Sequence, residues 1–413
     1  PEALLRPGEA LRAARRAPGA RESVTGGVES GAALRQRDHM TNGWDDSGQE
    51  QWLESASVDL ARGLGQLRGP RRVDVTAEDG AVTELEARRA VVIATGSDAR
   101  IPPISGIESV DYWDSRGATS SREVPESLTV IGGGVVGVEM AQAWSDLGSR
   151  VTIVGRDERL LPAEEPFAGD RLRAAFKERG INVITGIQAD GLLPDASRVI
   201  TILDNGQEIT SDRLLVAAGR KPRTESLGLD KVGLEPGKFI EVDDQMRAKG
   251  VDGGWLYAVG DVNGRALLTH MGKYQARILG DILAGKSDSR ASADVRAIPR
   301  VIFTDPHVAA VGLTERRAKA EGLNVRTVQY PFNGVAGAYV MGDGVEGDCN
   351  IVIDEDSRTI VGATFVGPGA SEMLHAATIA IAGRVSLDDL WHAVPAFPTV
   401  SEVWLRFLEE YGF

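Results

Sequence analysis

A glycine-rich turn between two apolar runs is the feature that most restricts the fold of this chain. The run at residues 128–131 leads into Gly132, Gly134 and Gly137, which have the G-x-G-x-x-G spacing. Residues 138–147 then follow a helical pattern, and residues 150–154 form a second apolar run. In a strand–turn–helix–strand unit, such glycines let the backbone approach a pyrophosphate at the helix N-terminus. The sequence therefore predicts dinucleotide binding, and the alternative is a tight turn of an α/β sheet that binds no ligand.

The residues after the second apolar run predict which dinucleotide binds. Sites that prefer NAD usually have Asp or Glu at this strand end, to bind the 2′-hydroxyl of the ribose. Gly155 takes that place here, and Arg156 and Arg159 follow. A guanidinium group can bind a 2′-phosphate through two hydrogen bonds. We therefore expect NADPH to be preferred and NADH to remain possible, with Arg156 as the main determinant and Arg159 as the second. The alternative is two solvated surface arginines.

Composition excludes several classes of function. The 413 residues are enough for two or three domains with a large core. A net charge of −14 argues against nucleic acid or an anionic membrane surface as a partner, and no apolar stretch is long enough to span a membrane. Cys349 is the only cysteine, so an internal disulfide is impossible and a cytoplasmic location is expected. The histidines and Cys349 lack metal-ligand spacing, so no metal site is predicted.

The pattern of elements predicts an α/β protein. Residues 1–70 contain charged helical stretches, and residues 72–86 alternate as a hairpin. The continuous apolar run at 90–94 is typical of a strand that is buried on both faces. Beyond the glycine turn, a second hairpin is expected to turn at residues 204–206.

The last third of the chain has a different pattern. Strands are expected at 308–312, 325–332, 350–354 and 360–366, and helices at 371–383 and 401–410. Strands that are followed by helices, without regular alternation, indicate a separate α+β domain.

The order and spacing of eight segments resemble those of the class I pyridine nucleotide–disulfide oxidoreductases over nearly the whole chain. The segments are residues 94–97, 132–139, 215–222, 257–261, 268–271, 298–306, 311–315 and 398–402. The resemblance implies two interleaved Rossmann-like dinucleotide-binding domains, of which the FAD domain is incomplete, and a C-terminal α+β dimerisation domain. It assigns 1–117 to the partial FAD-binding domain, 118–245 to the NAD(P)-binding domain, 246–292 to the return segment of the FAD-binding domain and 297–413 to the dimerisation domain.

The resemblance also implies roles for individual residues. Glu139 corresponds to an acid that lies near the nicotinamide, and Asp261 to an acid that binds the ribityl chain of FAD. Thr269 and His270 open a helix whose amides face the flavin; the alternative is that Thr269 caps this helix and His270 is a surface residue. The other implied cofactor-binding residues are Thr95, Gly96, Gly219 and Gly260.

Three departures from the family pattern change the expected chemistry. The family's N-terminal glycine motif and C-x₄-C redox pair have no counterpart, and the first residues resemble the helix beyond the second cysteine, so we expect an N-terminally truncated chain. Phe397 stands where the family has its acid–base histidine, and a phenyl ring cannot transfer a proton. Glu402, which would orient that histidine, then lacks its partner. Cys349 has no second thiol and is expected to be structural.

We therefore expect a FAD-dependent NAD(P)H oxidoreductase that passes hydride from NADPH through flavin to a small-molecule electron acceptor. The route is expected to differ from the conventional dithiol–histidine relay, with Glu402 and Glu139 as the candidate catalytic residues. His392 is not expected to be catalytic, and His375 is expected at a homodimer interface. The alternative is a catalytically inactive, dimeric NADP(H)-binding remnant that lacks FAD.

Overall fold

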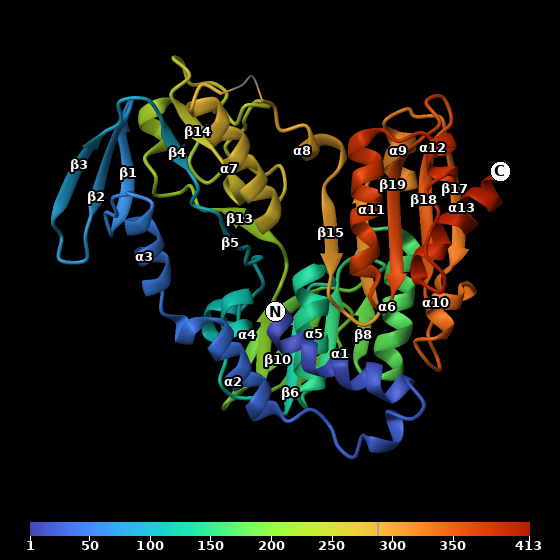
Figure 1. Ribbon diagram of the computed structural model, residues 1–413. Coiled ribbons are helices and arrows are strands. Elements are labelled where there is room, and N and C mark those ends of the chain that lie inside the picture. The colour runs from blue at the N-terminus through green and yellow to red at the C-terminus, as the bar shows by residue number, and fades with distance from the viewer. Residues whose placement is uncertain (287–288) are drawn as a thin grey trace. The chain divides into compact units, whose positions relative to one another are not determined.

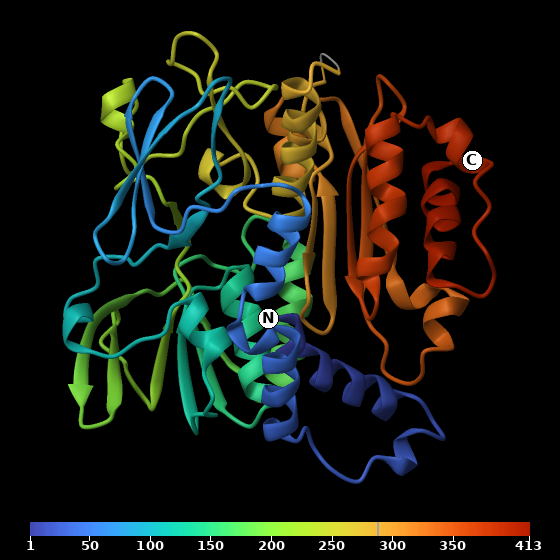
Figure 2. The same cartoon turned by 60° about the vertical axis from the view of Figure 1, so that its left-hand side comes forward.

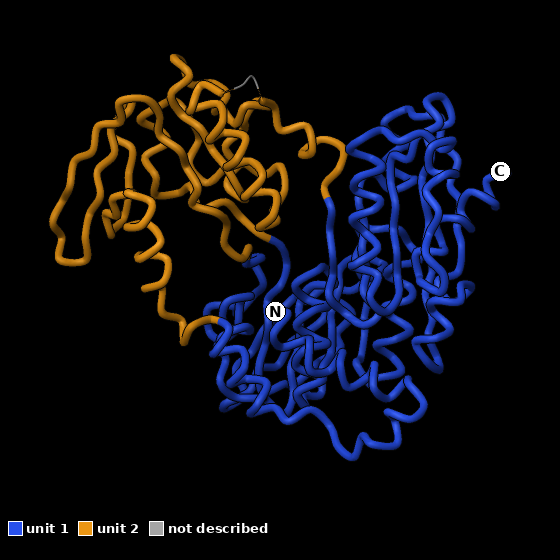
Figure 3. The backbone as a smooth tube through the Cα atoms, viewed as in Figure 1, with its two compact units in different colours: residues 1–40, 101–219, 299–413 blue, residues 41–100, 220–298 orange. Residues whose placement is uncertain are grey.

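The computed structural model describes residues 1–286 and 289–413 (Figure 1). These residues form two compact units, and each unit is assembled from separate stretches of the chain (Figure 3). Unit 1 contains Pro1–Met40, Ile101–Gly219 and Pro299–Phe413, and unit 2 contains Thr41–Arg100 and Arg220–Ile298. Residues 287–288, which fall within the predicted return segment 246–292, lie outside the described residues.

A four-stranded parallel sheet forms the middle stretch of unit 1. Its strand order is β12-β6-β7-β8. The strands are β6 (Ser127–Ile131), β7 (Arg150–Gly155), β8 (Asn182–Thr185) and β12 (Arg213–Val216). Helices α4 (Ser115–Ser120), α5 (Val135–Asp146) and α6 (Pro166–Glu178) pack against it. Because helices cover it, the apolar side chains of β6 are buried, and the predicted strand–turn–helix–strand unit is confirmed.

A three-stranded antiparallel sheet follows β8. It consists of β9 (Ala189–Asp195), β10 (Arg198–Leu203) and β11 (Glu208–Ser211), and β10 lies in the centre. The predicted hairpin turn is confirmed, since the amide of Gly206 donates to the carbonyl of Leu203 over 2.9 Å.

The last stretch of unit 1 is a five-stranded antiparallel sheet of order β15-β16-β19-β18-β17. Its strands are β15 (Pro299–Ile302), β16 (His307–Gly312), β17 (Val325–Pro331), β18 (Asp348–Asp354) and β19 (Thr359–Gly367). Helix α11 (Ala370–Gly383) lies along β16 and β19, as both views show (Figures 1 and 2). The remaining helices of this stretch are α9 (Glu315–Ala320), α10 (Ala336–Tyr339), α12 (Leu387–Trp391) and α13 (Val403–Tyr411). The predicted α+β pattern is confirmed.

Residues 1–40 pack with unit 1, whereas the predicted domain boundaries placed them with the FAD-binding part. Helix α1 (Glu2–Arg16) buries Leu4 and Leu5 in the same core as Trp144 of α5. Helix α2 (Ser30–Met40) packs against α1. Apolar burial against α5 therefore decides where α1 lies, and a sequence pattern does not reveal that partner.

A cluster of charges also holds α1 in unit 1. Asp305, between β15 and β16, accepts hydrogen bonds from Arg12 Nε over 2.6 Å and from Arg16 over 2.7 Å. Arg12 also pairs with Asp146 at 2.5 Å. Burial opposes ionisation of Asp305, but the Arg16, Arg179 and Arg12 guanidinium groups outweigh it and lower the pKa of Asp305. Three stretches of the chain are thus joined by partly buried ion pairs.

Unit 2 combines small sheets with one long helix. The antiparallel sheet is β1 (Leu64–Gly69), β2 (Arg72–Thr76) and β3 (Val82–Glu86), which confirms the hairpin predicted at 72–86. Strand β4 (Val91–Ile93) pairs in parallel with β14 (Leu256–Ala258), and β5 (Ser97–Ala99) pairs antiparallel with β13 (Arg220–Pro222). The helices are α3 (Ser47–Ser55), α7 (Thr269–Leu283) and α8 (Ala293–Arg296).

Residues 220–245, which the predicted boundaries assigned to the NAD(P)-binding domain, belong to unit 2. Leu229, Ile240 and Val242 share a core with Trp255 and Leu256 there. Short 3-10 helices complete the two units: η1 (Arg21–Ser23), η2 (Asn42–Trp44), η3 (Ile107–Ser109), η4 (Leu229–Val232), η5 (Gly260–Asn263), η6 (Phe332–Gly334) and η7 (Val400–Glu402). Within the described ranges, none of the helices has the length and apolar character needed to cross a membrane.

Candidate functional site

The predicted glycine turn joins β6 to α5, and close backbone contacts shape it. Gly132 has a φ of +123°, and a Cβ on it would lie 2.3 Å from the carbonyl oxygen of Ala217. A Cβ on Gly137 would lie 1.9 Å from the carbonyl oxygen of Gly132. By contrast, a Cβ on Gly134 would have no described atom within 4 Å. Gly132 and Gly137 therefore allow close backbone packing in the turn, and Gly134 borders open space.

The open space lies at the N-terminus of α5. Gly134 is the N-cap residue of this helix, so no N-cap side chain occupies the first backbone N–H groups. Those groups and the positive end of the helix dipole favour an anion. The turn therefore fits the pyrophosphate of a dinucleotide.

Arg156 and Arg159 follow β7 at the same edge of the sheet. A Cβ on Gly155, the last residue of β7, would lie 3.7 Å from the amide nitrogen of Gly133, so the strand end adjoins the glycine turn. The Arg156 side chain is 75% exposed and lies 4.0 Å from Asp157 Oδ1, while that of Arg159 is 54% exposed. Exposed ion pairs of this kind are weak, so both guanidinium groups can turn to a ligand.

Glu139 lies in the buried part of α5. It is 7% exposed, and its Oε1 accepts a hydrogen bond of 2.9 Å from the amide of Phe303. Burial raises the pKa of Glu139 to about 6, although the hydrogen bond from Phe303 favours the charged form. This carboxyl group can therefore gain or lose a proton near neutral pH. Its role beside a nicotinamide stays a prediction.

In unit 2, the parallel pair β4–β14 brings the predicted flavin-binding segments together. Ile93 is in register with Ala258, so the segments after the two strands leave the sheet at the same edge. Gly96 and Gly260 both have positive φ, +71° and +77°, and a Cβ on either would have no described atom within 4 Å. The predicted residues that gather at this edge are Thr95, Gly96, Gly260 and Asp261.

A chain of hydrogen bonds fixes the carboxylate of Asp261. Ser97 Oγ donates to Asp261 Oδ2 over 2.6 Å, and Arg220 Nε donates to Ser97 Oγ over 2.6 Å. Arg220 Nε also lies 3.6 Å from Asp261 Oδ2, and the Asp261 side chain is 24% exposed. A held but accessible carboxylate fits a polyhydroxyl chain such as the ribityl group of FAD. Sequence reasoning assigned no role to Ser97 or Arg220, although both lie in segments that carried the resemblance.

The other predicted cofactor-binding residues are exposed at the ends of elements. Gly219 follows β12 with a φ of +118°. Thr269 and His270 open α7, and both are exposed. The N-cap residue of α7 is Leu268, so Thr269 does not cap the helix, whereas the exposed His270 agrees with the other part of that alternative. Contact of these residues with a flavin stays a prediction.

The C-terminal candidates are arranged without a histidine. Glu402 is 8% exposed and pairs with Arg406 at 2.5 Å, and it accepts a hydrogen bond of 3.3 Å from the amide of Ala336. The ring of Phe397 is exposed, and so is His392. Arg406 therefore supplies the positive partner for Glu402. Glu402 and Arg406 have i,i+4 spacing in the helix predicted at 401–410, and this signal for an ion pair was missed in the sequence.

Cys349 lies fully buried in β18. Burial raises the pKa of its thiol, and a protonated, enclosed thiol is a poor nucleophile. His375 is exposed on α11. Across the described ranges, no group of three or more His, Cys, Asp or Glu side chains could hold a metal ion.

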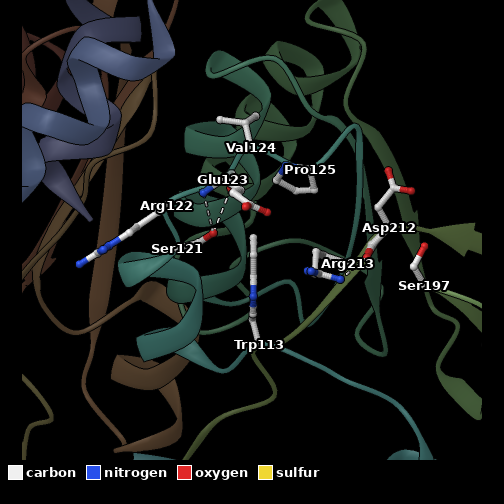
Figure 4. Close-up of a pocket in the computed structure, with 9 residues that line it drawn as sticks. All are labelled: Trp113, Ser121, Arg122, Glu123, Val124, Pro125, Ser197, Asp212 and Arg213. Atoms are coloured by element: carbon white, nitrogen blue, oxygen red, sulfur yellow. Dashed lines mark hydrogen bonds between the residues drawn. The ribbon is translucent and has the colours of Figure 1, made fainter.

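A pocket of about 380 Å³ opens at the opposite edge of the parallel sheet (Figure 4). Residues 121–125, which precede β6, form one part, and Asp212 and Arg213 at the start of β12 form another. The glycine turn follows the carboxyl end of β6. This pocket is therefore separate from the predicted nucleotide site.

Comparison with known proteins gives two family matches. A family described as pyridine nucleotide-disulphide oxidoreductase matches residues 18–276. The dimerisation domain of the same family matches residues 298–406.

Individual relatives agree with these matches. A dihydrolipoyl dehydrogenase of Thermus scotoductus is 36% identical, over 85% of this chain and 74% of its own length. A mercuric reductase of Staphylococcus aureus is 30% identical, over 92% of this chain and 68% of its own length.

Solved structures share the fold. LpdA of Mycobacterium tuberculosis is similar over 100% of this chain and 89% of its own, with a TM-score of 0.86 and 25% identity. The HOCl-induced flavoprotein disulfide reductase RclA of Escherichia coli shares the fold over 99% of this chain and 88% of its own, with a TM-score of 0.85 and 22% identity.

The predicted fold class and the resemblance are thus confirmed. The chain belongs to the pyridine nucleotide-disulphide oxidoreductase family, whose members are FAD-dependent NAD(P)H oxidoreductases with a C-terminal dimerisation domain.

Proposed function

We propose that this chain passes hydride from NADPH through FAD to a small-molecule electron acceptor without a dithiol–histidine relay. One observation supports the proposal: Phe397 stands where the family resemblance puts the acid–base histidine, and Arg406 pairs with Glu402 at 2.5 Å. Neither a phenyl ring nor a carboxylate paired with Arg406 can protonate a thiolate, and the buried Cys349 thiol is a poor nucleophile.

The proposal divides the binding of the cofactors between two sets of residues. The glycine turn and the N-terminus of α5 bind the pyrophosphate of NADPH, and Asp261, held by Ser97 and Arg220, binds the ribityl chain of FAD. FAD held by these residues would supply the redox chemistry between NADPH and the acceptor. An acceptor that reacts directly with reduced flavin needs no thiol, so we expect a quinone, a dye or dioxygen.

The first test is the visible spectrum of the purified protein, with added FAD and then with NADPH under anaerobic conditions. The proposal predicts a flavin band that NADPH bleaches and that a quinone restores. Dihydrolipoamide and Hg²⁺ are the substrates in the relatives' names. Turnover of either that is faster than turnover of a quinone, a dye or dioxygen would contradict the proposed acceptor. Failure to bind FAD would favour the inactive NADP(H)-binding remnant.

The preference for NADPH is proposed to depend on Arg156. Arg156→Glu puts a negative charge beside the 2′-phosphate, so kcat/KM with NADPH is expected to fall on the order of tenfold or more. The value with NADH is expected to change much less. Arg150→Glu, at the other end of β7, is the matched control and keeps the preference. An unchanged ratio in Arg156→Glu would leave Arg156 as a surface residue only.

A further inference from the structure

A buried polar network behind the Asp261 loop carries an inference about how unit 2 holds a flavin. Gln275 of α7 is 0% exposed. Its Oε1 accepts hydrogen bonds of 2.8 Å from the amide of Gly260 and 2.8 Å from Nδ2 of Asn263. Its Nε2 donates to Asp294 Oδ2 over 2.9 Å. One amide group thus joins the Gly260–Asn263 turn to α8.

The chemistry of the partners fixes the orientation of this amide. An amide can face either way by shape alone, and its hydrogen bonds decide the assignment. On one side the Gly260 N–H and the Asn263 amide are donors, and on the other side the Asp294 carboxylate is an acceptor. A reversed Gln275 would put NH₂ against two donors and oxygen against a carboxylate. The network therefore has one arrangement.

The helix backbone also touches the turn directly. A Cβ on Gly272, one turn before Gln275, would lie 3.2 Å from the Cα of Gly260. Gly260 has a φ of +77°, in the left-handed region. Gly272 therefore lets α7 approach, and Gln275 binds the N–H of the residue it approaches.

The turn is closed from its far end by Asn263. Its Nδ2 also donates to the carbonyl of Ala258 over 3.1 Å, and its Oδ1 accepts from the amide of Arg265 over 3.0 Å. The Arg265 guanidinium lies 3.6 Å from Asp294 Oδ2. Side-chain hydrogen bonds thus hold the turn before and after Asp261, whose own carboxylate remains partly exposed.

We propose that Gln275 is a positioning residue for flavin binding: it fixes the Gly260–Asn263 turn so that the Asp261 carboxylate stays beside Ser97 and Arg220. The proposal deepens the proposed function and rests on FAD binding by unit 2. Gln275 acts through Gly260 and Asp294.

The first test is Gln275→Met, which keeps the length of the side chain and removes its hydrogen bonds. In the ligand-free protein, amide hydrogen exchange of segment 256–264 is expected to become faster, since the Gly260 N–H loses its acceptor. The dissociation constant for FAD, from quenching of flavin fluorescence, is expected to rise on the order of tenfold. Gln207→Met, the same change on an exposed turn of unit 1, is the control and should alter neither quantity.

A second test exchanges the donor and acceptor roles. Gln275→Glu keeps an acceptor for the Gly260 N–H but places a carboxylate against Asp294, so FAD binding is expected to weaken. In the double variant Gln275→Glu/Asp294→Asn, the new amide at 294 donates to the new carboxylate at 275. This variant is expected to recover most of the affinity. A Gln275 that only fills space gives no such recovery.

The outcomes separate the inference from the function it rests on. Unchanged exchange of segment 256–264 in Gln275→Met overturns the inference, whatever happens to FAD. Faster exchange with unchanged FAD affinity, or no recovery in the double variant, also overturns the positioning role. If the wild-type protein binds no FAD, and Asp261→Asn gives the same result, the proposed function is overturned instead.

Discussion

Glu139 is a buried carboxyl group whose ionisation opposes folding. Its pKa is raised from 4.5 to about 6, chiefly by burial. Between these two values the folded state holds more protons than the unfolded state, so the free energy of unfolding falls as pH rises through this window. Below pH 4.5 the effect is absent, and above pH 6 it reaches about 2 kcal/mol.

Glu139→Gln is therefore expected to stabilise the protein at pH 7.5 by about 2 kcal/mol. An amide oxygen can still accept the hydrogen bond from Phe303, and no charge is buried. Urea unfolding at pH 7.5 and pH 4.5 measures this, and the gain should vanish at the lower pH. Glu178→Gln, at an exposed position of α6, is the control. An equal gain at both pH values would show that burial of charge is not the cause.

The role of a single residue was predictable where it belongs to a known motif. It was not predictable where a residue far away in the sequence determines its contacts or its pKa. Asp261 could be identified because its segment resembles a known one. The hydrogen bond from Ser97 to Asp261 depends on the β4–β14 pairing, which joins stretches more than 150 residues apart. In the same way, the pKa of Glu139 depends on what covers α5, and no local pattern carries that information.

At the scale of elements, the glycine turn predicts opposite results for two similar substitutions. Gly137→Ala would put a Cβ 1.9 Å from the Gly132 carbonyl oxygen, which forces α5 away from β6 and is expected to cost about 3 kcal/mol. Gly134→Ala meets open space at a φ of −84° and is expected to cost less than about 1 kcal/mol. Its Cβ would fill the place that a pyrophosphate approaches.

Chemical denaturation and NADPH titration distinguish the two variants. Gly134→Ala is expected to fold like the wild type and to bind NADPH at least about tenfold more weakly. Gly137→Ala should lose stability first. Normal NADPH affinity in Gly134→Ala would show that the turn does not hold the nucleotide.

The type of each element was predictable from hydrophobic periodicity and from the turn-forming residues between elements. The ends of the elements were less predictable. Within the charged helical stretches predicted for residues 1–70, α2 ends at Met40, because Asn42, Gly43 and Trp44 all have positive φ. Strand β14 is limited to Leu256–Ala258, since β4, its partner, has only three residues. Local sequence sets the type of an element, while its neighbours set its length.

At the scale of the whole molecule, exposed apolar side chains of the dimerisation domain predict a homodimer. They include Tyr339, Val340, Ile379, Val394 and Phe397. Ile379 of α11 is 56% exposed, and we expect this face of α11 to form the dimer contact, where Ile379→Glu would bury a charge. The dissociation constant of the dimer is expected to rise roughly a hundredfold.

Light scattering with size-exclusion chromatography over a range of concentrations measures the dimer. Val82→Glu is the matched control, because Val82 is 54% exposed on β3 of unit 2 and belongs to no dimerisation domain. A dimer that survives Ile379→Glu would place the interface away from this face of α11.

The assembly of unit 1 from three stretches has a consequence for synthesis on the ribosome. All of unit 2 has been translated by Ile298, so it is the first unit that can be completed. Helix α1 is made early, yet Arg12 and Arg16 reach Asp305 only when the last stretch emerges. Until then α1 lacks its final ionic contacts, so unit 1 can close only after a stretch that is translated later than the whole of unit 2.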